Sequence, residues 1–521
     1  MYNEGYADVM VVAFIIHYKL YIISLYHLPM LSFTLSLIAL IVGYIFYGRL
    51  VERIMQPDAQ RPTPALAHPD GVDYIPMPAW KVYMVQFLNI AGTGPIFGAI
   101  MGAKFGPAAY LWIVLGCIFA GAVHDYMVGM LSVRLGGAGL PEIVGRFLGH
   151  KARTAVMVFS VLLLIMVGAV FVYSPALILG HLCGSTLLWM LVIFAYYVLA
   201  TMLPIDKIIG KIYPLFAFSL LFMAVALMVC LFVEMPQLPE LWDGLGNKGA
   251  ATDVSFTDSL FPCLFITIAC GAISGFHSTQ SPLMARCIEN ERLGRPIFYG
   301  AMITEGMVAM VWATVAMYFF YGEPAPGYEL IAGAGNNGFH TAAPSVVTLI
   351  CNHWLGIVGG ILAMLGVVAC PITSGDTAFR SARLIVADFL HMDQQPITKR
   401  LTVSLPLFAC AIGMLVWQMD NNDGFNVVWQ YFGWANQSLT VVTLWAITVY
   451  LVQSGRLYLV ALIPALFMTA VCSTYLFVSP TALGLPAAVG NSLGLACTLL
   501  ALGWFLRWKK KYHASPTLHH D

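Results

Sequence analysis

The chain has 521 residues, of which 60% are hydrophobic and only 10% are charged. Soluble domains carry about 25% charged residues, and a soluble fold of this size could not bury so much apolar side chain. The 25 basic residues balance the 25 acidic ones, so no net positive field is present to attract nucleic acid. We predict an all-α integral membrane protein and expect no nucleic-acid partner.

The predicted membrane spans are runs of apolar residues long enough to cross a hydrocarbon core of about 30 Å, which takes about 20 residues of helix. Thirteen such runs occur, at 30–48, 82–102, 108–132, 153–175, 184–203, 212–233, 259–280, 297–320, 345–370, 401–418, 425–450, 457–478 and 486–507. With this division, one set of alternate loops holds 22 of the 25 Lys and Arg residues. Because basic residues mark cytoplasmic loops, the alternation predicts thirteen spans and a cytoplasmic C-terminus.

Residues 1–29 fit this pattern poorly, since the apolar stretch 9–16 is short and is followed by His17, Tyr18 and Lys19. The segment is either a fourteenth helix or an upstream extension before a natural start at Met30, and we favour the second interpretation. A secretory signal peptide is disfavoured because no basic region precedes the apolar stretch and no small-residue cleavage site follows it.

Two of the predicted spans contain helix breakers. The first contains Gly92-Thr93-Gly94-Pro95, where proline suits the first turn of a restarted helix. The second contains glycines and hydroxyl residues at 271–281 and then Pro282, which we interpret as a further restart. Close helix packing at small residues is the alternative explanation for each break taken alone.

The position of the two breaks predicts an inverted repeat. Five spans begin at the first broken helix and five more begin at the second. Since five is odd, the two sets must have opposite orientations, as in many secondary transporters. The predicted divisions are an N-terminal extension, a peripheral helix with a cytoplasmic linker, repeat one, an extracytoplasmic loop, repeat two, two peripheral helices and a cytoplasmic tail, at 1–29, 30–81, 82–233, 234–258, 259–450, 451–507 and 508–521.

Several segments resemble the carbon starvation protein A (CstA) family. They lie at 78–81, 90–96, 121–126, 131–134, 141–145 and 274–281. The resemblance covers most of the chain from Met30 onward, and the chain looks like a short version of the family. It implies a bacterial inner-membrane transporter linked to peptide uptake under carbon starvation and, in some members, to proton-coupled pyruvate uptake. It also implies the five-plus-five, LeuT-like fold of the amino acid, polyamine and organocation superfamily.

The two breaks are the predicted substrate site. Peptides and pyruvate carry a carboxylate, and a restarted helix turns free N–H groups and the positive end of its dipole into the break. The substrate candidates are Gly92, Thr93, Gly94, Ser274, Gly275, Ser278 and Thr279. A kink for packing alone is the alternative.

A coupling cation needs oxygen ligands from unwound backbone, hydroxyl groups or carboxylates. The candidates are Ala91, Gly94, Thr373, Ser374 and Asp376. Carbonyls of Ala91 and Gly94 with the Thr373 and Ser374 hydroxyls would suit sodium, whereas Asp376 could carry a proton. Alternatively, the residues at 373–376 cap an amphipathic helix that follows the span.

Ionisable residues inside spans are costly and are often functional. His124, Asp125, His277 and Glu305 are therefore candidates for a proton relay or gate. For Asp125, a structural ion pair with Arg134 or another cytoplasmic-side base is the alternative, and the histidines could simply be satisfied within a helix interface. The eleven cysteines lack CxxC pairs and histidines at ligand spacing, so we expect no metal site and no cofactor beyond a proton or sodium ion. Whether His124 and Asp125 bind a metal stays open.

The sequence thus predicts a cation-coupled importer of peptides, pyruvate or both. A carrier of another small carboxylate or amino acid, an ion channel and a nutrient sensor are the alternatives, and no enzyme motif is present. Peptide versus pyruvate, proton versus sodium, and monomer versus oligomer stay open.

Overall fold

The computed structural model describes residues 29–182, 184–203, 205–245, 259–321, 343–421 and 424–514. Within these ranges the longer elements are all α-helices. In the first half they are α2 (Leu31–Met55), α3 (Pro64–Ala67), α4 (Ala79–Ile90), α5 (Ala99–Gly102), α6 (Ala108–Gly116), α7 (Ala122–Arg134), α8 (Leu140–Leu148), α9 (His150–Leu182), α10 (Thr186–Met202) and α11 (Ile205–Glu234). In the second half they are α12 (Phe265–Thr267), α13 (His277–Ala285), α14 (Gly300–Tyr321), α16 (Ala343–Phe389), α17 (Ile397–Asp420), α18 (Gly424–Gln453), α19 (Leu459–Val478) and α20 (Ala487–Ala514).

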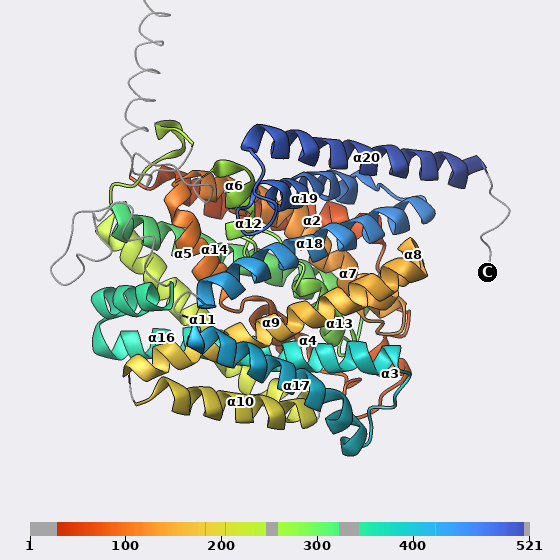
Figure 1. The fold of residues 1–521 in the computed structure, drawn as a ribbon, viewed down its shortest axis with the longest axis horizontal. Helices are drawn as coiled ribbons and strands as arrows, with labels where there is room; N and C mark the ends of the chain where they lie inside the picture. The colour runs from red at the N-terminus through yellow and green to blue at the C-terminus, as the bar shows by residue number, and fades with distance from the viewer. Residues whose placement is uncertain are drawn as a thin grey trace, which may run out of the picture.

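The helices form a bundle whose outer members expose apolar side chains. In the view of Figure 1, α20 lies along one edge beside α19, α10 lies along the opposite edge, and α4, α9 and α13 lie between them. On α20, Leu500 and Trp504 are 73% and 78% exposed, which suits contact with lipid chains. A helix satisfies its own backbone hydrogen bonds, and this is why it can cross a bilayer.

Nine helices among the described residues are long and apolar enough to cross a membrane, and the bent pair at 79–105 raises the number to ten. Thr186–Met202 and Val346–Gly356 are shorter apolar helices. Each of the thirteen predicted spans overlaps a helix. The helices that are long and apolar enough to span a membrane show a multi-pass membrane protein, and the number thirteen stays a prediction. The predicted N-terminal extension lies almost wholly outside the described residues, as do much of the loop at 234–258 and residues 515–521 of the tail.

The first predicted break is confirmed at the expected position. Helix α4 ends at Ile90, a π-helical turn begins at Gly94, and the two parts are bent by 51°. Side chains of α16 contact the freed carbonyls: the Ser374 hydroxyl donates to the oxygens of Leu88 and Asn89, both at 3.1 Å, and the Cys370 thiol meets the oxygen of Ala91. The break is therefore held by a helix of the predicted second repeat.

The second predicted break is also present, at 268–276 between α12 and α13. The restart predicted at Pro282 is wrong, because α13 begins at His277 and Pro282 lies inside it. Asn436 of α18 holds this break: its Oδ1 accepts hydrogen bonds from the Phe276 N–H at 2.6 Å and from the Ser274 hydroxyl at 3.1 Å. The two breaks face each other, since a Cβ atom at Gly94 would overlap Cys270.

Helix α16 is longer than the sequence predicts. The span was expected to end at residue 370 and a separate helix to follow a cap at 373–376, but α16 runs from Ala343 to Phe389, with non-helical backbone only at Gly356. The cap interpretation is wrong, because Thr373, Ser374 and Asp376 all lie in the helix interior. One helix thus extends from the first break to the predicted cytoplasmic end of the bundle.

Candidate functional site

A chain of four buried ionisable side chains crosses the centre of the bundle. Asp125 on α7 bridges two histidines: its Oδ1 lies 2.8 Å from Nδ1 of His124, and its Oδ2 lies 2.8 Å from Nδ1 of His277 at the start of α13. On the other side of the ring, Nε2 of His277 lies 3.4 Å from Oε2 of Glu305 on α14. The structure therefore brings together all four residues predicted as a relay or gate.

These four side chains are shielded from solvent, with an exposed fraction of 0% for each. Neither carboxylate oxygen of Glu305 makes a well-formed hydrogen bond within the described part of the chain, and neither does Nε2 of His124. Buried polar groups usually have such partners. The chain therefore ends in groups with unused hydrogen-bonding capacity.

The alternative ion pair between Asp125 and Arg134 does not form, because Arg134 has another partner. Arg134 lies at the far end of α7 and pairs with Glu291 at 3.2 Å, and its guanidinium also donates to the oxygens of Met55 and Gln56. These contacts fasten the end of α2 to the end of α7 (Ala122–Arg134). Among the described residues, the ion-pair contacts of Asp125 are those with His124 and His277.

Cys270, His277 and Glu305 each offer one donor atom within 4.8 Å of the others, and all three are buried. A thiol, an imidazole and a carboxylate form a set that a divalent transition metal could accept. Cys270 and His277 are seven residues apart in sequence, and the break brings them together in space. The sequence spacing matches no standard ligand motif, so the pattern could not reveal the group.

The predicted substrate residues line both breaks and are all buried. The Ser278 and Thr279 hydroxyls donate to nearby carbonyls, of Gly275 at 2.5 Å and of Phe276 at 2.7 Å. The Thr93 hydroxyl has no hydrogen-bond partner among the described residues. A Cβ atom at Gly275 would overlap the backbone of Asn436 and Thr440, so glycine permits this close helix contact. The predicted substrate residues are thus enclosed by packed helices.

The residues predicted as a sodium shell lie at the first break and on the part of α16 that packs against it. The Thr373 hydroxyl bonds to carbonyls of its own helix, at 2.8 Å to Cys370 and 3.1 Å to Ala369. Ser374 contacts α4 one turn before Ala91, and Asp376 Oδ2 accepts a hydrogen bond of 2.7 Å from the Tyr213 hydroxyl on α11. The hydrogen-bond partners of Thr373, Ser374 and Asp376 thus lie on three different helices, α16, α4 and α11.

Two polar residues that hold this region were missed by sequence reasoning, namely Asn436 and Tyr213. Both are buried within apolar spans. Isolated polar residues in such spans are the signal that could have found them, since their cost implies a partner.

The family described as "Carbon starvation protein CstA" matches residues 29–179, 172–323 and 330–475. An uncharacterized membrane protein of Haemophilus influenzae is 45% identical over 59% of this chain and 95% of its own length. The proteins named Peptide transporter CstA in Escherichia coli and Mycobacterium tuberculosis are each 27% identical. They match 82% and 80% of this chain and 78% and 70% of their own lengths.

Among solved structures, a manganese transporter of Eremococcus coleocola is similar with a TM-score of 0.53 and 13% sequence identity. The match covers 85% of this chain and 98% of that one. At this identity the likeness concerns the fold alone.

Proposed function

The chain belongs to the carbon starvation protein CstA family, and we propose that it is a proton-coupled importer of short peptides in the bacterial inner membrane. Relatives along most of its length are named peptide transporters. The multi-pass helical structure suits that role. We propose further that uptake serves the response to carbon starvation, as the family name suggests.

The proposed architecture has thirteen spans with a cytoplasmic C-terminus and a LeuT-like five-plus-five inverted repeat. Its support is the pair of breaks, each opening one set of five predicted spans and each held by a polar side chain from another helix. Transporters of this plan bind substrate where the two discontinuous helices meet. Movement of the helices at the breaks against the remainder would open the closed site alternately to each side.

The observation that carries proton coupling is the buried chain from His124 through Asp125 and His277 to Glu305. It joins α7 of repeat one to α13 and α14 of repeat two. A proton gained by Glu305 would neutralise its carboxylate and remove its attraction for His277 at 3.4 Å. Because His277 begins the helix after the second break, that change would reach the substrate site directly.

Sodium coupling stays the alternative, because the Thr373 and Ser374 hydroxyls donate to carbonyl oxygens and still have oxygen lone pairs that a cation could use. Pyruvate shares only the carboxylate with a peptide, and we propose that this group lies against the free N–H groups of a half-helix at the breaks. The named relatives favour peptides.

The test is uptake by purified protein in liposomes. We expect an inward proton gradient to drive accumulation of labelled dialanine, and a sodium gradient at equal pH to drive none. Pyruvate is measured in parallel and should accumulate less. EDTA should leave uptake unchanged, because the proposed site holds protons.

Three results would contradict the proposal. Uptake driven by a sodium gradient would indicate that sodium is the coupling ion and would point to a site near Thr373 and Ser374. Loss of uptake in EDTA would assign Cys270, His277 and Glu305 to a metal ion. Currents of many ions per opening, recorded across a planar bilayer, would indicate a channel.

A further inference from the structure

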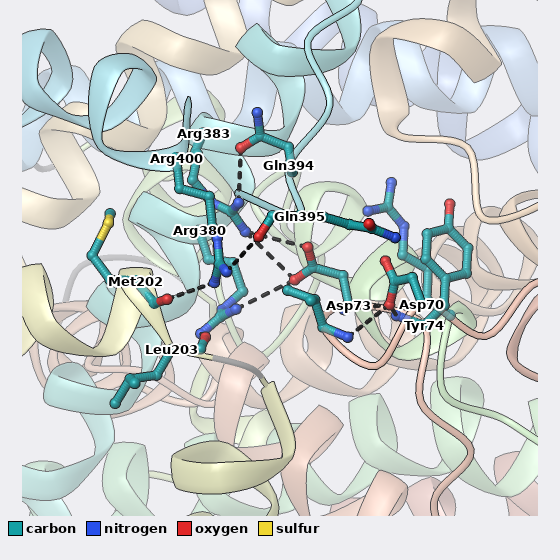
Figure 2. Close-up of polar contacts among 12 residues, drawn as sticks. Asp70, Asp73, Tyr74, Met202, Leu203, Arg380, Arg383, Gln394, Gln395 and Arg400 are labelled. Atoms are coloured by element: carbon teal, nitrogen blue, oxygen red, sulfur yellow. Dashed lines mark hydrogen bonds and ion pairs between the residues drawn. The ribbon is translucent and has the colours of Figure 1, made fainter. Parts of the chain in front are cut away.

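A second buried charge cluster lies at the predicted cytoplasmic end of α16, where Asp73 of the linker before α4 contacts two arginines. Asp73 Oδ1 lies 3.3 Å from Nη1 of Arg380, and its Oδ2 lies 3.3 Å from Nη2 of Arg383. Figure 2 shows the carboxylate between the two guanidinium groups. Both arginines are 0% exposed and Asp73 is 3% exposed.

The cluster has more positive charge than Asp73 can neutralise. Arg286 and Arg400 are also buried, at 5% and 4% exposed. Burial raises the pKa of Asp73, but the guanidinium groups of Arg383, Arg380 and Arg286 outweigh this effect and hold the pKa below its usual value. Asp388 lies 3.7 Å from Arg286, so Asp73 is the carboxylate in ion-pair contact with the two fully buried arginines, Arg380 and Arg383.

Asp73 also fits the two arginines loosely. Its contacts with them measure 3.3 to 3.5 Å, whereas charge-assisted hydrogen bonds between such groups are usually about 2.7 to 2.9 Å. The Nε groups of Arg380 and Arg383 have no hydrogen-bond partner among the described residues, although both are buried. The pair thus has spare donors that a differently placed carboxylate could use.

The cluster is close to the cytoplasm and connected to the substrate site. A recess of about 410 Å³ is lined by Tyr74, next to Asp73 in sequence, and by Arg286 and Asp388. In the other direction, α16 carries Ser374, which holds the first break, and Arg380 fewer than two turns later. A shift of Asp73 would act on the linker that leads into the broken helix α4.

From these contacts we infer that Arg380 and Arg383 form an exit subsite for the carboxylate of the substrate, which Asp73 occupies in the closed state as a tethered substitute. The inference rests on the proposed transport of peptides. A leaving peptide would displace Asp73, take up the spare guanidinium donors and free the linker before α4.

The experiment measures binding to purified protein in detergent, without any gradient. Isothermal calorimetry compares dialanine with its C-terminal amide on the wild type, Asp73→Ala and Asp73→Asn. If Asp73 fills the subsite more than nine-tenths of the time, its removal should raise the affinity for dialanine by about tenfold or more. The amide should gain nothing, and Asp73→Ala with Arg383→Ala should lose the gain.

Glu291→Gln is the matched control, because Glu291 is another buried carboxylate paired with two arginines, Arg61 and Arg134. It should not change dialanine affinity. Unchanged affinity in Asp73→Ala and Asp73→Asn, or an equal gain for the amide, would overturn the inference, and Asp73→Asn decides if the alanine variant does not fold. Acetate that competes with dialanine on Asp73→Ala supports a carboxylate subsite. Failure of proton-driven uptake, by contrast, would refute the proposed function, and the binding result could still be interpreted because it is measured without a gradient.

Discussion

At the residue scale, the central feature is four ionisable side chains linked in a buried line. Such groups are expensive away from water unless each has a partner. Asp125 is satisfied by two histidines at 2.8 Å, whereas the ion-pair contact of Glu305 with His277 is longer, at 3.4 Å. Because Glu305 has the weaker contact, we expect its carboxylate to be the group in this line that gains and loses a proton.

Glu305→Gln should separate transport from coupling. The amide keeps the shape of the side chain but cannot exchange a proton, so gradient-driven accumulation of dialanine should fall to background. Exchange of labelled for unlabelled dialanine without a gradient should persist.

Glu234→Gln is the control for that change, because Glu234 is exposed at the end of α11 and should retain accumulation. Full gradient-driven accumulation by Glu305→Gln would exclude Glu305 from the coupling site.

Asp73 gives a pH-dependent contribution to stability. Its pKa is lower in the folded protein than its ordinary value of 3.8, so its stabilising effect is complete above pH 3.8 and is lost as the pH falls through the lower folded value. Breaking a buried ion pair costs about 3 kcal/mol. Asp73→Asn should therefore unfold at a lower temperature than the wild type at pH 7.

Thermal unfolding followed by tryptophan fluorescence measures this difference, which should shrink as the pH falls below 3.8. A difference that stays constant down to pH 3 would mean that the charge of Asp73 does not stabilise the fold.

At the scale of elements, the broken helices depend on glycine where they approach one another. Gly94 faces Cys270, and Gly275 faces the backbone of α18. The freed carbonyls are contacted by the Ser374 hydroxyl and the Cys370 thiol. The breaks are therefore positioned by tertiary contacts as well as by glycine and proline.

Gly94→Leu should abolish dialanine uptake while membrane insertion stays intact. Even the first carbon of the new side chain would overlap Cys270, which would separate the two breaks. Uptake in liposomes and the yield of folded protein on size exclusion check the two halves of this expectation.

Gly503→Leu is a suitable control, because a Cβ atom there meets nothing within 4 Å. Normal uptake by Gly94→Leu would show that the first break is only a packing kink.

At the scale of the whole molecule, charge placement and apolar length predict the orientation in the membrane. The basic residues gather in alternate loops, and the outermost helices expose leucine and tryptophan toward lipid. The two buried charge clusters lie at different depths: one lies at the breaks, and the other lies toward the loops that carry Arg and Lys.

Alkaline phosphatase fused after Asp521 should be inactive, and a green fluorescent protein fused there should fluoresce, because the positive-inside rule places that end in the cytoplasm. A fusion within the loop at 234–258 should give the opposite pattern. The reverse result at both sites would invert the proposed topology.

Sequence reasoning was most successful where a signal is local. Gly92-Thr93-Gly94-Pro95 cannot continue a regular helix, and the break occurs there. It failed where a residue's role depends on a distant partner. Ser374 and Asp376 resemble capping residues by type, but their bonds go to α4 and to Tyr213 on α11. Helix α16 therefore continues through them.

The sequence by itself determined the membrane class, the family, the two breaks and the four ionisable residues worth testing, because apolar length, charge sidedness and helix breakers act within a few residues. Only the tertiary structure decided that Asp125 lies between two histidines, that Cys270 lies beside His277 and Glu305, and that Asp73 lies between Arg380 and Arg383. These contacts join residues up to 310 positions apart. They depend on how helices pack against one another, a property that periodicity and spacing do not encode.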